Sequence, residues 1–152
     1  MVIVVTVGIA TTVAVAGSLA AAELLCGPIR RGDEVALRYW LERGVPVNWS
    51  GVDGTPILWA VMKRQPRMVA MLLDFGADPD EAVSVAVTGG HLDILRMLDA
   101  RGIDLTARCG AYRQPPIDVA RGYGHHEVVA FLEDVARRRN RNGVSPPRHP
   151  AP

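Results

Sequence analysis

The sequence predicts an all-α solenoid, in which short helix-turn-helix units stack on one another. The first observation is an internal repeat: residues 44–48 read G-V-P-V-N, residues 76–80 read G-A-D-P-D, and residues 102–106 read G-I-D-L-T. Each stretch follows an apolar run of helical character. A unit that recurs about every 30 residues indicates a repeat architecture, and such an architecture favours binding over catalysis as the function.

Local signals place the helices within each unit. Thr55-Pro56 suits a helix start, because threonine caps a free N–H and proline fits the first turn. Met68, Val69, Leu72 and Leu73 form one apolar stripe of a second helix. The glycine that follows each second helix can enter positive φ without a steric penalty. One unit cannot bury its own stripe, so about three units are needed for a stable domain.

The motifs recur in register along residues 28–136. The second unit reads D-G-T-P-I-L-W-A from Asp53 and exits through G-A-D at Gly76. The third carries Gly90-His91 and exits at Gly102, and the fourth carries P-I-D-V-A from Pro116 and Gly124-His125. The first is weaker, with Gly32-Asp33 in place of G-H and an exit from Gly44 to Asn48. This pattern resembles the ankyrin repeat, which implies four stacked helical hairpins joined by finger loops.

Two departures from the ankyrin pattern predict local differences. Gly44 and Gly76 are 32 residues apart, whereas Gly76 and Gly102 are only 26 apart. The third unit should therefore lack most of its finger, and its helix should start at once with Asp78 or Asp80 as the cap. In the second unit Arg64-Gln65-Pro66 replaces G-H, so we expect a different turn between its helices.

The N-terminal segment carries no charged side chain before Glu23. About 20 apolar residues can cross a bilayer as a helix. The segment therefore predicts a membrane anchor over residues 1–25. Arg30, Arg31 and Arg38 on its C-terminal flank would place the repeats in the cytoplasm. Two alternatives stay open: a cleaved signal peptide, giving a secreted or periplasmic protein, and an apolar helix that caps the first unit.

Charge is unevenly distributed along the chain. The formal net charge is +1, but the tail 137–152 holds five of the 17 basic residues, four prolines and no acid. Such a tail cannot bury enough surface to offset its ordering entropy, and we expect it to be disordered. The predicted organisation is thus an N-terminal segment 1–25, a repeat domain 26–136 and a basic tail 137–152. No aromatic residue interleaves the tail arginines, which makes nucleic-acid binding an unfavoured interpretation.

The sequence predicts no enzyme, no cofactor and no metal site. It lacks the glycine-rich phosphate loops, the H-E-x-x-H pattern and the G-x-S-x-G pattern. Cys26 and Cys109 fall on different units and form no C-x-x-C pair. His91 and His125 match the structural histidine of the repeat, so we assign them no ligand.

The resemblance also implies a protein-binding surface, on the fingers and on the ends of the first helices. Trp49 and Tyr112 are favoured as binding anchors, since exposed aromatic residues concentrate binding energy. Trp40 and Trp59 fall on positions that the repeat buries. The full set of predicted protein-binding residues is Trp49, Ser50, Val52, Asp53, Met62, Lys63, Thr88, Arg108, Tyr112, Arg113 and Tyr123.

The function predicted from the sequence is a monomeric protein-interaction module, a scaffold or adaptor held at a membrane by its N-terminal helix. An exported binding or inhibitor protein, and an inhibitor that occludes one partner enzyme, are the alternatives. The identity of the partner is not encoded in the repeat, because binding positions vary independently of the fold.

Overall fold

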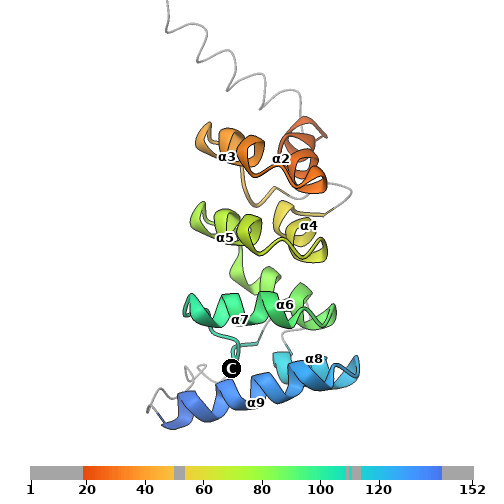
Figure 1. The fold of residues 1–152 in the computed structure, drawn as a ribbon, viewed down its shortest axis with the longest axis vertical. Helices are drawn as coiled ribbons and strands as arrows, with labels where there is room; N and C mark the ends of the chain where they lie inside the picture. Colours follow the sequence, from red (N-terminus) through yellow and green to blue (C-terminus); the bar gives the residue numbers. More distant parts are fainter. Residues whose placement is uncertain (1–18, 50–53, 109, 111–113, 142–152) are drawn as a thin grey trace, which may run out of the picture. The chain divides into compact units, whose positions relative to one another are not determined.

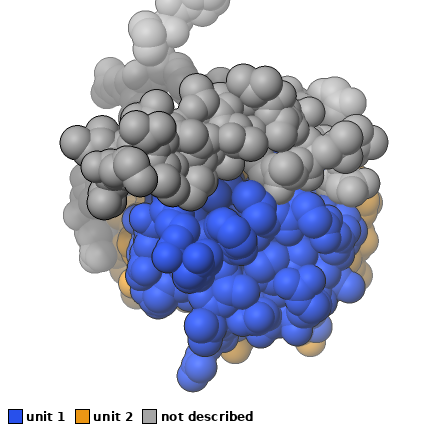
Figure 2. All heavy atoms as spheres, turned by 90° about the horizontal axis from the view of Figure 1, so that it is seen from above, with its two compact units in different colours: residues 1–78 blue, residues 79–152 orange. Residues whose placement is uncertain are grey.

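Eight α-helices make up the part of the chain that the structure, a computed structural model, describes. That part comprises residues 19–49, 54–108, 110 and 114–141. The chain divides into two compact units, residues 1–78 and 79–152, which Figure 2 distinguishes by colour. The all-α fold predicted from the sequence is confirmed.

The first unit contains two helical hairpins. In Figure 1 the hairpin of α2 and α3 lies beside the hairpin of α4 and α5, with first helix against first helix and second against second. The helices are α2 (Leu19–Arg31), α3 (Glu34–Glu42), α4 (Pro56–Met62) and α5 (Pro66–Asp74). Each hairpin corresponds to one of the repeats predicted from the sequence.

The second unit repeats this arrangement with two more hairpins. α6 packs against both α7 and α8, and α9 packs against α7 and α8 (Figure 1). The helices are α6 (Pro79–Thr88), α7 (Leu92–Ala100), α8 (Pro116–Gly122) and α9 (His126–Arg141). The described chain therefore holds four repeats, as predicted.

The core of each unit is apolar. Met68, Val69 and Leu72 of α5 are buried, as predicted for the stripe, whereas its fourth member, Leu73, is only half-buried. In the second unit the corresponding stripes supply Ile94, Leu95 and Leu98 of α7, and Val128 and Leu132 of α9. Among the described residues, no polar or charged residue is fully buried. The hydrophobic effect therefore supplies the main stabilisation of both units.

The helix ends follow the local signals in the sequence. The Thr55 hydroxyl accepts a hydrogen bond from the Leu58 amide at 3.3 Å and caps α4, while Asp33 accepts from the Ala36 amide at 2.9 Å and caps α3. Gly44, Gly76 and Gly102 all have positive φ, as expected for helix exits. The turn between α4 and α5 differs as predicted, because Arg64 takes a positive φ of 53° where the other repeats have glycine.

The shortened third repeat is also confirmed, with one correction. α6 begins at Pro79, directly after Asp78, so no finger precedes it. Asp80 lies within the first turn of α6 and is not its cap. Asn48 holds the segment that leads into α6. Its side-chain amide donates a hydrogen bond to the Gly76 carbonyl at 2.8 Å and accepts one from the Asp78 amide at 3.0 Å.

The predicted membrane location is wrong. None of the helices in the described ranges has the length and apolarity needed to cross a bilayer. Residues 19–25, assigned to the anchor, belong to α2, which packs against α3 and α4 and whose Leu25 and Ile29 are buried. Apolar composition alone had suggested lipid, whereas the Leu25 and Ile29 side chains are buried within the protein. The remainder of the predicted anchor, residues 1–18, lies outside the described residues.

The exported alternative allows two cleavage sites of small residues. Cleavage after Ala22 would remove the first turn of α2, which starts at Leu19, whereas cleavage after Ala16 falls outside the described residues and leaves α2 intact. The predicted boundary between residues 25 and 26 therefore falls inside a helix of the first repeat.

The last repeat ends in the longest described helix. α9 continues through the predicted boundary at residue 136 and ends at Arg141. Arg138 donates to Asp99 at 3.1 Å, which ties this extension to α7 within the second unit. The rest of the predicted basic tail, residues 142–152, lies outside the described residues.

Candidate protein-binding surface

In the first unit, three of the predicted binding residues lie near the finger or at the end of α4. Met62 closes α4 and is 54% exposed, and Lys63, the C-cap of the same helix, is exposed. Trp49 is half-buried at the start of the finger. Ser50, Val52 and Asp53 lie outside the described residues. The unit thus offers an apolar and a cationic group side by side in sequence at the end of α4.

In the second unit, the structure brings Thr88 and Tyr123 together through a histidine. His125 donates from Nε2 to the Thr88 carbonyl oxygen at 2.8 Å. The Tyr123 ring stacks on the His125 ring, with centroids 6.2 Å apart and planes inclined by 7°. Tyr123 nevertheless remains 62% exposed. Because His125 is itself hydrogen-bonded, the exposed tyrosine is held in a defined orientation, which lowers the entropy cost of using it in binding.

The predicted finger of the fourth repeat is only partly described. Arg108 is exposed, while Tyr112 and Arg113 lie outside the described residues. The Thr88 hydroxyl donates to the Ser84 carbonyl at 2.8 Å, so this group already has a partner within α6. The Thr88 hydroxyl and carbonyl are thus both hydrogen-bonded within the second unit, to Ser84 and His125.

Asp104 fixes the loop that leads to Arg108. Its carboxylate accepts hydrogen bonds from the Thr106 amide at 2.8 Å, the Thr106 hydroxyl at 2.7 Å and the Ala107 amide at 3.2 Å. It also forms an ion pair with Arg139 of α9. Burial raises the pKa of Asp104, but the bonds from Thr106 and the charge of Arg139 outweigh burial, so the pKa lies below its ordinary value.

This environment predicts an acid-sensitive contribution to stability. Because the pKa of Asp104 is lower in the folded chain, its ionised form favours folding above the unfolded value of 3.8, and this contribution is lost as the pH falls through the folded pKa. Urea unfolding of Arg139→Gln and the parent chain, measured from about pH 6 down to pH 3, should show a destabilisation that shrinks as the pH falls. Arg137→Gln is the control, since Arg137 only approaches Asp134 at 4.0 Å. A destabilisation by Arg139→Gln that is constant with pH would contradict the assignment.

One group of exposed side chains was not predicted as a site. Tyr39 is 45% exposed, and its ring meets the Trp40 ring edge-on, with centroids 5.0 Å apart and planes at 89°. The guanidinium of Arg43 lies 3.3 Å from the centre of the Tyr39 ring and donates to the Tyr39 carbonyl. We name these three residues the α3 aromatic cluster. The sequence pattern had placed Trp40 in the core, and it is only half-buried.

Trp59 is likewise only half-buried, where the sequence had predicted burial. The guanidinium of Arg30 lies 5.9 Å from the centre of its ring, within the range of a cation–π contact. Arg30 also forms an ion pair with Glu23. The first helices of this unit thus carry a charged and aromatic surface rather than a closed apolar one.

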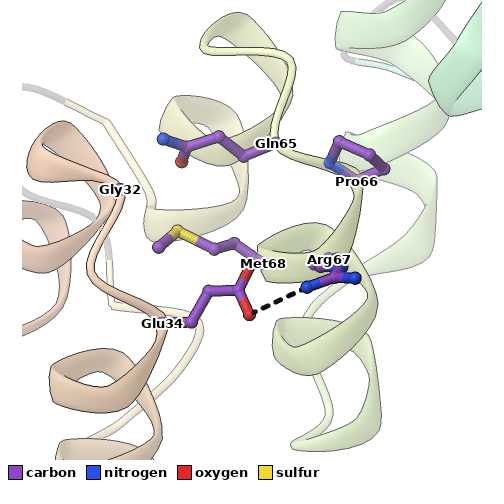
Figure 3. A pocket seen from close by; sticks show the side chains of 6 residues that line it. All are labelled: Gly32, Glu34, Gln65, Pro66, Arg67 and Met68. Atoms are coloured by element: carbon purple, nitrogen blue, oxygen red, sulfur yellow. Dashed lines mark ion pairs between the residues drawn. The ribbon is translucent and has the colours of Figure 1, made fainter.

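A small hollow lies between the helix-connecting turns of the first unit. It has a volume of about 270 Å³ and is lined by Gly32, Glu34, Gln65, Pro66, Arg67 and Met68 (Figure 3). Glu34 and Arg67 form a long ion pair of 4.0 Å across it. The hollow is below the volume of about 300–1,000 Å³ that is usual for ligand pockets, so it does not define a small-molecule site. Within the described ranges, no cluster of three potential metal ligands occurs.

The fold and the exposed groups define a repeat-built module that presents a surface to other proteins. Residues 54–85 match the family model described as "Ankyrin repeat". The chain is 32% identical over 123 residues to cyclin-dependent kinase inhibitor 2A of Monodelphis domestica, covering 76% of this chain and 71% of that protein. The chain belongs to the ankyrin-repeat family.

Two further relatives extend the comparison. Cyclin-dependent kinase 4 inhibitor B of Bos taurus is 32% identical over 120 residues, which cover 74% of this chain and 91% of the relative. NF-kappa-B inhibitor cactus of Drosophila melanogaster is 33% identical over 63 residues, 41% of this chain and 13% of the relative. All three relatives are named as inhibitors of other proteins. The prediction of a protein-interaction module is confirmed at this level.

Proposed function

We propose that this chain is an inhibitor that binds one partner protein, with a protein kinase as the favoured partner. The observation that carries the proposal is the similarity, over about three quarters of the chain, to proteins named as inhibitors of cyclin-dependent kinases. The inhibitor interpretation takes the place of the membrane scaffold, since the expected membrane location is wrong. An adaptor that binds a partner without inhibiting it is the second candidate, because ankyrin proteins use the same surface to grip other proteins.

Each unit offers its own exposed groups to the proposed partner. Met62 and Lys63 supply an apolar and a cationic group in the first unit, and Tyr123 supplies an ordered aromatic ring in the second. Aromatic side chains account for a large share of interface energy when a partner covers them. In this proposal, inhibition follows from occupying the partner's surface. We expect the chain to act as a monomer, with one copy per partner.

The test is a titration of the full-length chain into active cyclin-dependent kinase 4, with kinase activity and binding heat measured in parallel. We expect both saturable binding and loss of activity. Binding without loss of activity would support the adaptor candidate instead. Absence of binding to this kinase would contradict the favoured partner, and ultracentrifugation of the mixture would test the expected ratio of one to one.

Tyr123→Ala should weaken this binding by about tenfold or more, because it removes an exposed and oriented aromatic ring. The midpoint of thermal unfolding should change little, since most of the ring is solvent-exposed in the free chain. Val35→Ala is the matched control: Val35 is 81% exposed but lies outside the proposed surface. Equal affinities of the two variants for the kinase would show that Tyr123 is not part of the proposed contact surface.

A further inference from the structure

The first repeat exposes a face that the second repeat buries. α3 and α5 are related by a shift of 32 residues, since Glu34–Glu42 corresponds to Pro66–Asp74. Ala36, Tyr39 and Trp40 therefore correspond to Met68, Met71 and Leu72. In α5 these three side chains are almost completely buried, at 1%, 7% and 0% exposure. In α3, Tyr39 is 45% exposed and the other two are half-buried.

The buried face of α5 is the one that meets the preceding repeat. α5 packs against α3 within the first unit, and Met68 lines the hollow that it shares with Gly32 and Glu34 of that repeat. Figure 3 shows the Met68 side chain extending toward the chain that carries these two residues. The equivalent face of α3 is thus built to be covered by a further element on the N-terminal side of the first repeat.

Val35 shows that α3 is not more exposed than α5 at every position. Val35 is 81% exposed, and Arg67, its equivalent in α5, has an 84% exposed side chain. That position points to solvent in both repeats. Leu37 and its equivalent Val69 are fully buried in both repeats, so the greater exposure of Ala36, Tyr39 and Trp40 reflects a missing cover on that face and not a looser helix.

We propose that residues 1–18 cover this face of α3. The segment runs directly into Leu19, the first residue of α2, and α2 packs against α3. It occupies the sequence position from which a preceding repeat would supply the cover. Its side chains carry no charge, so none of them loses ionic hydration on packing against Trp40 and the side of the Tyr39 ring that the Arg43 guanidinium leaves open.

Length and tethering support this occupant over a separate molecule. A segment of 18 residues spans about 27 Å as a helix, against about 14 Å for the nine residues of α3. A covalently attached segment also has a much higher effective concentration than a free partner. The face of Ala36, Tyr39 and Trp40 then serves as an internal docking surface for the uncharged stretch that precedes the first repeat.

Photo-cross-linking in the full-length chain tests the proposal. A benzoylphenylalanine placed at position 39 should cross-link within the same molecule to residues 1–18, as mapped by peptide mass spectrometry. The same group at position 35 is the control and should give little of this product. Products that join two copies, or products from position 39 confined to residues after Leu19, would overturn the proposal.

Hydrogen exchange supplies a second measurement that does not alter the face. Val13→Asp would place a charge in the segment, and we expect faster amide exchange in the α3 peptide with unchanged exchange in α9. Equal exchange of α3 in the parent chain and the variant would overturn the proposal. Both experiments are independent of any kinase, so their failure would leave the proposed inhibitor function untouched.

Discussion

Leu72→Ala should lower the free energy of unfolding by about 2–5 kcal/mol, the range for removing a large buried aliphatic side chain. Leu72 is completely buried in α5, the helix that packs against α3 of the preceding repeat. The substitution both removes apolar contacts and leaves a cavity that neighbouring helices can close only in part. Urea denaturation, followed by circular dichroism, measures the loss.

Leu73→Ala is the matched control for this experiment. It makes the same chemical change one residue along the chain, but Leu73 is only half-buried. We therefore expect a clearly smaller loss. If Leu72→Ala cost less than about half a kilocalorie per mole, or no more than Leu73→Ala, the assignment of Leu72 to the inter-repeat core would be wrong.

Gly90→Ala should be the most damaging exchange at a turn. Gly90 has φ of +68°, and a β-carbon there would lie 2.8 Å from Nδ1 of His125. His125 cannot withdraw freely, because its ring donates to the Thr88 carbonyl at 2.8 Å. We expect the free energy of unfolding to fall by about 1–2 kcal/mol because of the backbone conformation, and by about 1–3 kcal/mol more because of crowding.

Gly102→Ala separates these two contributions. Gly102 has φ of +78°, but a β-carbon there would meet no atom within 4 Å. Thermal unfolding of both variants should show the smaller loss for Gly102→Ala. The two losses would be equal if His125 moved aside without cost, and that result would contradict the assignment of the His125–Thr88 hydrogen bond as a restraint on the His125 ring.

The repeat architecture was predictable because its signals are local. A threonine cap, a proline in the first turn and a glycine at the exit act over a few residues, and all recur in the structure around α4 and α5. The shortened third repeat was equally readable, since it follows from counting residues between Gly76 and Gly102. Helical periodicity then identified the buried stripe of α5 without any tertiary information.

The features that were not predicted depend on tertiary packing, that is, on which helix packs over a given side chain. Apolar composition reads alike for a membrane helix and for a buried one, so residues 19–25 were assigned to lipid and not to α2. Trp40 occupies a position that is buried in α5, and its partial exposure follows from its place in the first repeat. The pairing of Asp104 with Arg139 joins residues 35 positions apart, which no local pattern encodes.

Asn48 makes the fold sensitive to a slow chemical change. Its amide nitrogen donates to the Gly76 carbonyl, and its oxygen accepts from the Asp78 amide, so both ends of one side chain join successive repeat exits. Deamidation would convert that nitrogen into a second acceptor and bring it against a carbonyl oxygen, with no proton between them at neutral pH. The oldest molecules in a stored sample would then loosen first at the exits of the first two repeats, while the second unit kept its own contacts.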